Sequence, residues 1–163
     1  MGYRVSEVMA FTNNDYVVVR NSAGRNAFEL LTAPAAGWLM LEPPSLVWNT
    51  RYGMRTGWQA NWAGGGMMPA LMGGGRAAGR WDGWYAAGKV RVKTTSDAAA
   101  VANRWLGRTR PGERAVGARP FPGYFTLDTT YRGRPAGMIS VNAQGAVWYH
   151  GWHGGFLAAR HYS

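Results

Sequence analysis

The fold is decided by residues 121–150, which read FPGYFTLDTTYRGRPAGMISVNAQGAVWYH. Aromatic and β-branched side chains alternate with other residues here, a pattern typical of strands. The stretch predicts three strands, at residues 124–131, 137–141 and 146–150. Turn-forming residues separate them, at Arg132–Pro135 and Asn142–Gly145. These thirty residues therefore predict a small antiparallel sheet.

A helix is expected immediately before this sheet, over residues 96–106. Ser96 suits the N-cap position, and Asp97 suits the positive end of the helix dipole. One apolar face is formed at helical spacing by Ala98, Val101, Ala102, Trp105 and Leu106. Gly107 stands where a C-terminal glycine ends many helices. Residues 89–94, with Val90 and Val92 alternating against charges, predict a short strand that leads into the helix.

Residues 11–40 repeat the strand plan without a preceding helix. Strands are expected at residues 16–19, 27–31 and 38–41. Pro43-Pro44 is expected to end this first unit. The chain starts too close to these strands to provide a matching helix. The repeat therefore predicts either a further N-terminal segment or a partner that covers that face of the sheet.

The sequence predicts an α+β protein with two small antiparallel β-sheet units, the second with a packed N-terminal helix. The first unit covers residues 1–44 and the second covers residues 89–163. Between them, residues 45–88 are rich in Gly, Trp and Met, and their apolar residues follow no period of 2 or 3.6 residues. This middle segment is expected to be an irregular connector.

The composition is strongly basic, with 18 Lys and Arg against 8 Asp and Glu and a formal net charge of +10. Nucleic acid, an anionic membrane surface and an acidic protein are the partners that such a charge favours. An Arg-rich balance also follows from a GC-rich genome alone. The absence of cysteine excludes disulfides, thiolate metal sites and thiol catalysis. No apolar run reaches the roughly 18 residues of a spanning helix.

The second half resembles a PepSY-type domain, a family with a helix followed by an antiparallel sheet of about three strands. The turn at Ser140–Trp148 and the stretch Val147–Gly154 carry the resemblance, together with Glu7–Phe11 and Ala27–Leu31 in the first half. They are similar to paired PepSY-like units of uncharacterised bacterial and archaeal extracytoplasmic proteins. The resemblance implies a non-catalytic module linked to protease inhibition or envelope regulation. The chain departs from the family in lacking a helix before its first strands.

Two histidines and a methionine cluster are the candidate metal ligands. His150 and His153 lie three residues apart between glycine and tryptophan, and imidazoles can ligate copper, zinc or haem iron. Met67, Met68 and Met72 lie among glycines, and thioethers suit Cu(I). The alternatives are a hydrogen-bonding role for the histidines and partner contact for the methionines.

Enzymatic signatures are weak, and the chain is predicted not to be an enzyme. No phosphate-binding or dinucleotide-binding glycine motif occurs. Ser140, His150 and Asp128 could be drawn as a triad, but Ser140 lies within a predicted strand and lacks a nucleophile elbow. Basic and aromatic residues alternate too loosely to favour nucleic acid, and no RNA-binding signature accompanies them.

The leading hypothesis is a non-catalytic, extracytoplasmic accessory protein that docks on a cell-envelope or membrane protein complex. Arg and Trp side chains carry much interface energy. The candidate contacts are Trp48, Arg51, Trp58, Trp62, Arg80, Trp81, Trp84 and Trp152. The alternative is a periplasmic copper- or haem-binding protein that uses the histidines and the methionine loop.

Overall fold

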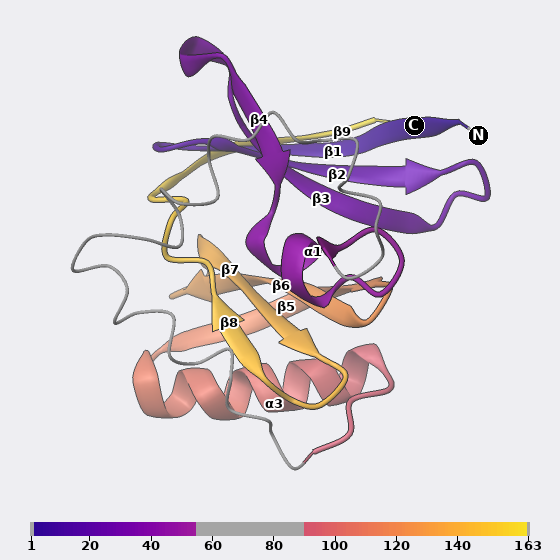
Figure 1. Cartoon of the computed structure of the whole chain (residues 1–163). Helices are drawn as coiled ribbons and strands as arrows, with labels where there is room; N and C mark the ends of the chain where they lie inside the picture. The colour runs from indigo at the N-terminus through magenta and orange to yellow at the C-terminus, as the bar shows by residue number, and fades with distance from the viewer. Residues whose placement is uncertain (1, 55–89, 163) are drawn as a thin grey trace.

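The computed structural model describes residues 2–54 and 90–162, in which nine strands form two antiparallel sheets. The strands are β1 (Tyr3–Phe11), β2 (Asp15–Asn21), β3 (Asn26–Ala33), β4 (Trp38–Leu41), β5 (Glu113–Phe121), β6 (Tyr124–Tyr131), β7 (Arg134–Asn142), β8 (Val147–Tyr149) and β9 (Phe156–His161). The first sheet has the order β4-β3-β2-β1-β9 and the second the order β5-β6-β7-β8. Figure 1 shows the first sheet above the second, with α3 (Thr95–Thr109) below both. The predicted α+β class is confirmed.

Both sheets contain four strands that follow one another along the chain and pair with their sequence neighbours. The six strands predicted at Tyr16–Leu41 and Tyr124–His150 are confirmed as β2 to β4 and β6 to β8. Each sheet also opens on a strand that the sequence analysis missed, β1 in the first and β5 in the second. The two halves therefore share one strand plan.

Local irregularities explain why β1 and β5 escaped prediction. In β1 the register shifts between Val5 and Glu7, which interrupts the alternation. In β5 the register shifts between Val116 and Arg119. Gly117 lies in this interruption with a φ of +62°, a conformation that glycine adopts without strain. Because β5 is an edge strand, it also tolerates Pro120.

The C-terminal strand β9 belongs to the first sheet, although it follows the strands of the second sheet in sequence. The sequence predicts that residues 89–163 form the second unit, yet β9 pairs with β1 of the first sheet. Most β9 side chains are exposed, and Ala158 and Ala159 are weak strand formers. The backbone pairing with β1, which no local pattern predicts, therefore fixes this strand.

The predicted helix is present as α3, with different ends. Thr94, rather than Ser96, is the N-cap, because its side chain accepts a hydrogen bond from the Asp97 backbone while the Asp97 side chain bonds back. Gly107 lies inside the helix, which continues until the Arg110 N–H bonds to the Leu106 carbonyl. Residues 90–94 form no strand, contrary to prediction. The helix buries Ala98, Ala102 and Leu106 against the second sheet.

Pro43-Pro44 begins a helix instead of simply ending the first unit. Helix α1 (Pro43–Trp48) has proline in its first turn, where the fixed φ and the missing N–H cost little. In Figure 1, α1 lies between the two sheets. A core of Met9, Phe11, Tyr16, Val18, Phe121, Tyr124 and Met138 fills the space between the sheets. Residues 55–88 of the predicted connector lie outside the described residues.

Candidate metal centre

Glu42 is held in place at the junction of β4 and α1. Its backbone N–H donates to the Glu29 carbonyl at 2.9 Å, and its carbonyl accepts from the Leu46 N–H at 2.8 Å. The Glu42 side chain is fully buried between the sheets. A buried carboxylate needs compensating groups around it, because removal from water penalises its charge.

His150 and His153 lie in the segment that joins β8 to β9. The His150 N–H donates to the Met138 carbonyl at 2.9 Å, which extends the pairing beyond β8. The Asn13 N–H donates to the His153 carbonyl at 3.1 Å. Gly154 follows with a φ of +78°, and a Cβ at this position would collide with the Thr12 side chain. Glycine therefore allows this segment to lie against the turn between β1 and β2.

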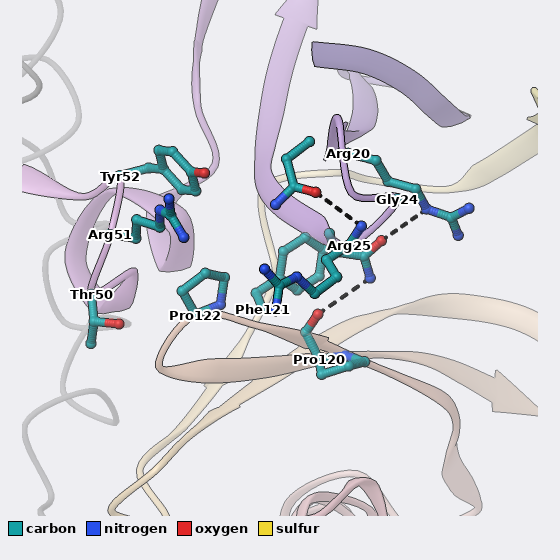
Figure 2. A pocket seen from close by; sticks show the side chains of 11 residues that line it. Arg20, Gly24, Arg25, Thr50, Arg51, Tyr52, Pro120, Phe121 and Pro122 are labelled. Carbon is teal, nitrogen blue, oxygen red and sulfur yellow. Dashed lines mark hydrogen bonds between the residues drawn. The ribbon is translucent and has the colours of Figure 1, made fainter. Parts of the chain in front are cut away.

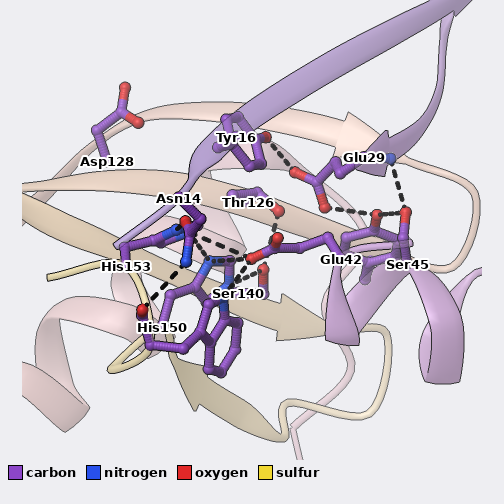
Figure 3. A network of polar contacts seen from close by, with 12 residues as sticks. Asn14, Tyr16, Glu29, Glu42, Ser45, Thr126, Asp128, Ser140, His150 and His153 are labelled. Atoms are coloured by element: carbon purple, nitrogen blue, oxygen red, sulfur yellow. Dashed lines mark hydrogen bonds and ion pairs between the residues drawn. The ribbon is translucent and has the colours of Figure 1, made fainter. Parts of the chain in front are cut away.

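Three potential ligand atoms of these residues form a nearly regular triangle (Figure 3). Glu42 Oε1 lies 3.1 Å from His150 Nδ1 and 3.2 Å from His153 Nε2. The two imidazole nitrogens are 3.4 Å apart. A tetrahedral zinc ion, with bonds of about 2.0–2.1 Å, separates its ligand atoms by about 3.3 Å. The triangle therefore has the size of one face of a zinc coordination tetrahedron.

Asn14 fixes the orientation and the protonation of the His153 ring. The Asn14 amide nitrogen donates to the Trp152 carbonyl at 3.2 Å, so the amide oxygen is the atom that faces His153 Nδ1, at 2.7 Å. The proton of this contact must be on Nδ1. His153 Nε2, opposite the Glu42 carboxylate, then carries either a second proton or a lone pair available to a cation.

The second nitrogen of His150 is held in a similar way. His150 Nε2 lies 2.9 Å from Ser140 Oγ, and that hydroxyl lies 2.8 Å from Thr126 Oγ1. In the metal-free protein a proton on His150 Nδ1 donates to Glu42, whereas a proton on Nε2 leaves the Nδ1 lone pair available to a cation. The two rings are also stacked, His153 on Phe11 at 4.3 Å and His150 on Trp152 at 4.7 Å.

Only one of the two oxygens of the Glu42 carboxylate has hydrogen-bond partners among the described residues. The Trp152 indole N–H donates to Oε1 at 2.9 Å. Oε2 is buried and has no hydrogen-bond partner within residues 2–54 and 90–162. Burial by itself raises the pKa of Glu42, but the charge of His153 and hydrogen bonds from both rings outweigh it and hold the pKa at about 2. Burial lowers the pKa of His150, against the opposing effect of Glu42.

A second buried carboxylate, Glu29, lies beside this triangle and behaves in the opposite way. The hydroxyls of Tyr16 and Tyr124 both donate to it, the latter at 2.6 Å. Ser45 Oγ completes the group, accepting from the Glu29 N–H at 2.8 Å and lying 2.7 Å from the Tyr124 hydroxyl. Burial and the nearby charge of Glu42 raise the pKa of Glu29 to about 7. Because the two pKa values differ so widely, Glu42 carries the negative charge and Glu29 keeps its proton at a pH between these values.

In the structure, the third residue beside Ser140 and His150 is Glu42, whereas the sequence suggests Asp128. Ser140 does contact His150, but Asp128 is paired with Arg119 at 2.6 Å. Glu42 occupies the third position, so Ser140, His150 and Glu42 are connected as in a Ser-His-Glu triad. Ser140 is fully buried in β7 beside Thr126, which leaves its hydroxyl inaccessible to a substrate. This burial argues against Ser140 as a nucleophile.

Of the candidate metal ligands, His150 and His153 are brought together, whereas Met67, Met68 and Met72 lie outside the described residues. Among the candidate partner contacts, Arg51 is exposed. Trp48 and Trp152 are half-buried and pack with Trp148. The remaining candidates also lie outside the described residues: Trp58, Trp62, Arg80, Trp81 and Trp84. The sequence analysis missed Glu42, since no motif spacing connects it to the histidines.

Comparison with protein-family models, curated proteins and solved structures finds no match to this chain. The resemblance to PepSY-type domains, the extracytoplasmic location and the non-enzymatic character therefore stay predictions. Within residues 2–54 and 90–162, no helix combines the length and the apolar character needed to cross a membrane. The fold and the site define an α+β protein with a buried Glu-His-His cluster between its two sheets.

Proposed function

We propose that this protein binds one divalent metal ion of the zinc class through Glu42, His150 and His153. The observation that carries the proposal is the triangle of ligand atoms, with edges of 3.1, 3.2 and 3.4 Å. Each edge is close to the separation of about 3.3 Å between the ligands of tetrahedral zinc. The buried Glu42 Oε2, without a described partner, supports the proposal independently, because a carboxylate can also bind an ion through both oxygens.

The donor set favours zinc over the copper and haem alternatives considered from sequence. One carboxylate oxygen and two imidazole nitrogens at tetrahedral separations suit Zn²⁺, whereas Cu(I) prefers thiolates and thioethers and Cu(II) prefers square-planar or tetragonal geometry. Haem would require space beside an axial imidazole, and both rings are fully buried against aromatic side chains. A copper site completed by the methionine loop stays a prediction, because those residues lie outside the described part of the chain.

The bound ion would connect parts of the chain that are distant in sequence. Glu42 precedes α1, and Asn14, which orients His153, lies in the turn before β2. The histidines follow β8 of the other sheet. A structural metal contributes its binding free energy to folding, because the unfolded chain offers no preformed site. The proposed function is therefore metal binding that also fixes the two sheets together.

A zinc titration of the metal-free protein tests the site. We expect isothermal titration calorimetry to give one zinc ion per chain for the wild type. We expect His153→Ala and Glu42→Gln each to weaken binding at least tenfold, because each removes one of three ligands. X-ray absorption of the zinc-loaded protein should show nitrogen and oxygen neighbours at about 2.0–2.1 Å.

The third histidine of the chain provides a matched control. His161 is 75% exposed at the end of β9 and is not part of the triangle. His161→Ala should bind zinc as the wild type does. Equal affinity in the wild type, His153→Ala and Glu42→Gln would contradict the proposal, since the ion would then bind elsewhere.

Docking on an envelope or membrane protein complex is the second candidate function. The observation that favours it is the edge strand β9, which exposes Leu157 at 62% and leads to the exposed Tyr162. Exposed edge strands can accept an added strand from a partner. A tagged chain that recovers no stoichiometric protein from solubilised membranes would remove this candidate.

A further inference from the structure

A basic pocket lies where three connecting segments meet (Figure 2). They are the turn between β2 and β3, the residues that follow α1, and the turn between β5 and β6. The cavity has a volume of about 560 Å³, within the range of small-molecule sites. Asn14 precedes β2, whereas Arg20 lies near the other end of that strand, so this pocket is separate from the Glu-His-His triangle.

Among the described residues, three arginines and no carboxylate line this pocket. Arg25 and Arg51 are exposed and make no ion pair with any described part of the chain. Arg20 lies directly opposite Arg4 across β1 and β2. Like charges at opposing strand positions destabilise a sheet unless something neutralises them. The pocket therefore concentrates positive charge that the described chain does not compensate.

Six of the seven acidic side chains of the described residues are engaged elsewhere, and the seventh, Asp15, lies at the far end of β2 from Arg20. Glu7 and Asp128 both contact Arg119, at 3.3 Å and 2.6 Å. Glu113 contacts Arg110 at 2.6 Å, and the buried Glu29 and Glu42 form the networks between the sheets. An anion from solution is thus the natural partner of the arginine group.

Hydrogen bonds hold one wall of the pocket in position. Arg20 Nε donates to Asn26 Oδ1 at 3.2 Å, and Asn26 Nδ2 donates to the Pro120 carbonyl at 3.3 Å (Figure 2). Arg51 is placed over the Tyr52 ring, with its guanidinium carbon 5.7 Å from the ring centre. Both Tyr52 and Phe121 are buried in the lining. The pocket combines oriented guanidinium groups with an apolar wall.

We infer that this pocket binds the phosphate groups of a small phosphorylated molecule. Guanidinium groups bind phosphate through paired hydrogen bonds as well as charge, which a lysine ammonium cannot reproduce. The aromatic and proline wall at Tyr52, Phe121 and Pro122 suits an organic group attached to the phosphate. The inference goes beyond metal binding and does not depend on it, because no residue is shared between the two sites.

Amide chemical-shift titrations with pyrophosphate and with ADP test the inference. We expect both ligands to shift the amide signals of Gly24, Thr50 and Arg51 in a saturable way. The double variant Arg25→Ala/Arg51→Ala should weaken pyrophosphate binding at least tenfold. Arg25→Lys/Arg51→Lys, which keeps the charge, should recover only part of the affinity, because it removes the paired hydrogen bonds.

A charge-matched control distinguishes the pocket from the general basicity of the chain. Arg104→Ala/Arg108→Ala removes two exposed arginines from α3 and should leave pyrophosphate binding unchanged. Equal losses in both double variants would overturn the inference. So would binding to vesicles that contain phosphatidylglycerol, but not to pyrophosphate or ADP, since a flat anionic surface would then be the partner.

Discussion

We expect Glu29→Ala to lower the free energy of unfolding by about 3 kcal/mol or more. The variant leaves the buried Tyr16 hydroxyl without its acceptor and removes one of the two partners of the Tyr124 hydroxyl, the other being Ser45. Each orphaned buried group costs about 1–3 kcal/mol. Urea unfolding, followed by tryptophan fluorescence, measures the loss. A loss below about 1 kcal/mol would show that the buried network contributes little to stability.

Glu29→Gln should change the pH dependence of stability in a direction set by the raised pKa. Burial and the charge of Glu42 raise the Glu29 pKa from 4.5 to about 7, so the folded protein retains a proton that the unfolded chain releases. This contribution is complete below about pH 4.5 and is lost as pH rises through 7. One pKa unit corresponds to about 1.4 kcal/mol, so the full change is about 3 kcal/mol.

The comparison of wild type and Glu29→Gln at pH 5 and pH 8, in the presence of a chelator, isolates this contribution. A glutamine has nearly the same shape but does not titrate. The stability advantage of the wild type should therefore be larger at pH 5 than at pH 8. Parallel pH profiles for the two proteins would contradict the assignment of a proton to Glu29.

Zinc is expected to raise the melting temperature of the protein substantially. A ligand that binds only the folded state, at a free concentration 100 times its Kd, adds about 2.7 kcal/mol. For a chain of this size that corresponds to a rise of about 5–10 °C. The effect follows from the position of Glu42, His150 and His153, which are brought together only in the folded protein. Differential scanning calorimetry with and without zinc measures it.

The same variants provide the controls for the thermal experiment. His161→Ala should keep the full zinc-dependent rise, because its exposed side chain lies outside the triangle. His153→Ala should lose the rise, even though its metal-free melting temperature will also differ. A zinc-dependent rise that is equal in His153→Ala and wild type would show that the Glu-His-His triangle is not the site.

Local patterns predicted the larger part of the fold. The strand prediction at Tyr124–Tyr131 matches β6, and the turn at Asn142–Gly145 precedes β8 as expected. The helix prediction identified the buried face of α3 but not its ends. Its start depends on which of Thr94 and Ser96 caps the helix, a choice between two similar residues, and its C-terminal end lies beyond Gly107.

The missed elements are those whose conformation depends on distant partners. Strand β9 is an exposed, alanine-containing segment that is fixed by backbone pairing to β1 at the other end of the chain. Helix α1 begins at two prolines, which equally well end an element. Neither conformation follows from the periodicity of its own residues.

The sequence by itself determined the class of fold, six of the nine described strands and the two histidines as candidate ligands. These depend on hydrophobic spacing and residue chemistry, which are properties of short segments. Only the tertiary structure decided that Glu42 completes the cluster with the two histidines, beside Trp152, which donates to it from 110 residues away. It also decided that the arginines at residues 20, 25 and 51 line one pocket. Packing of the two sheets brings these groups together, and contacts of such sequence separation leave no local signal.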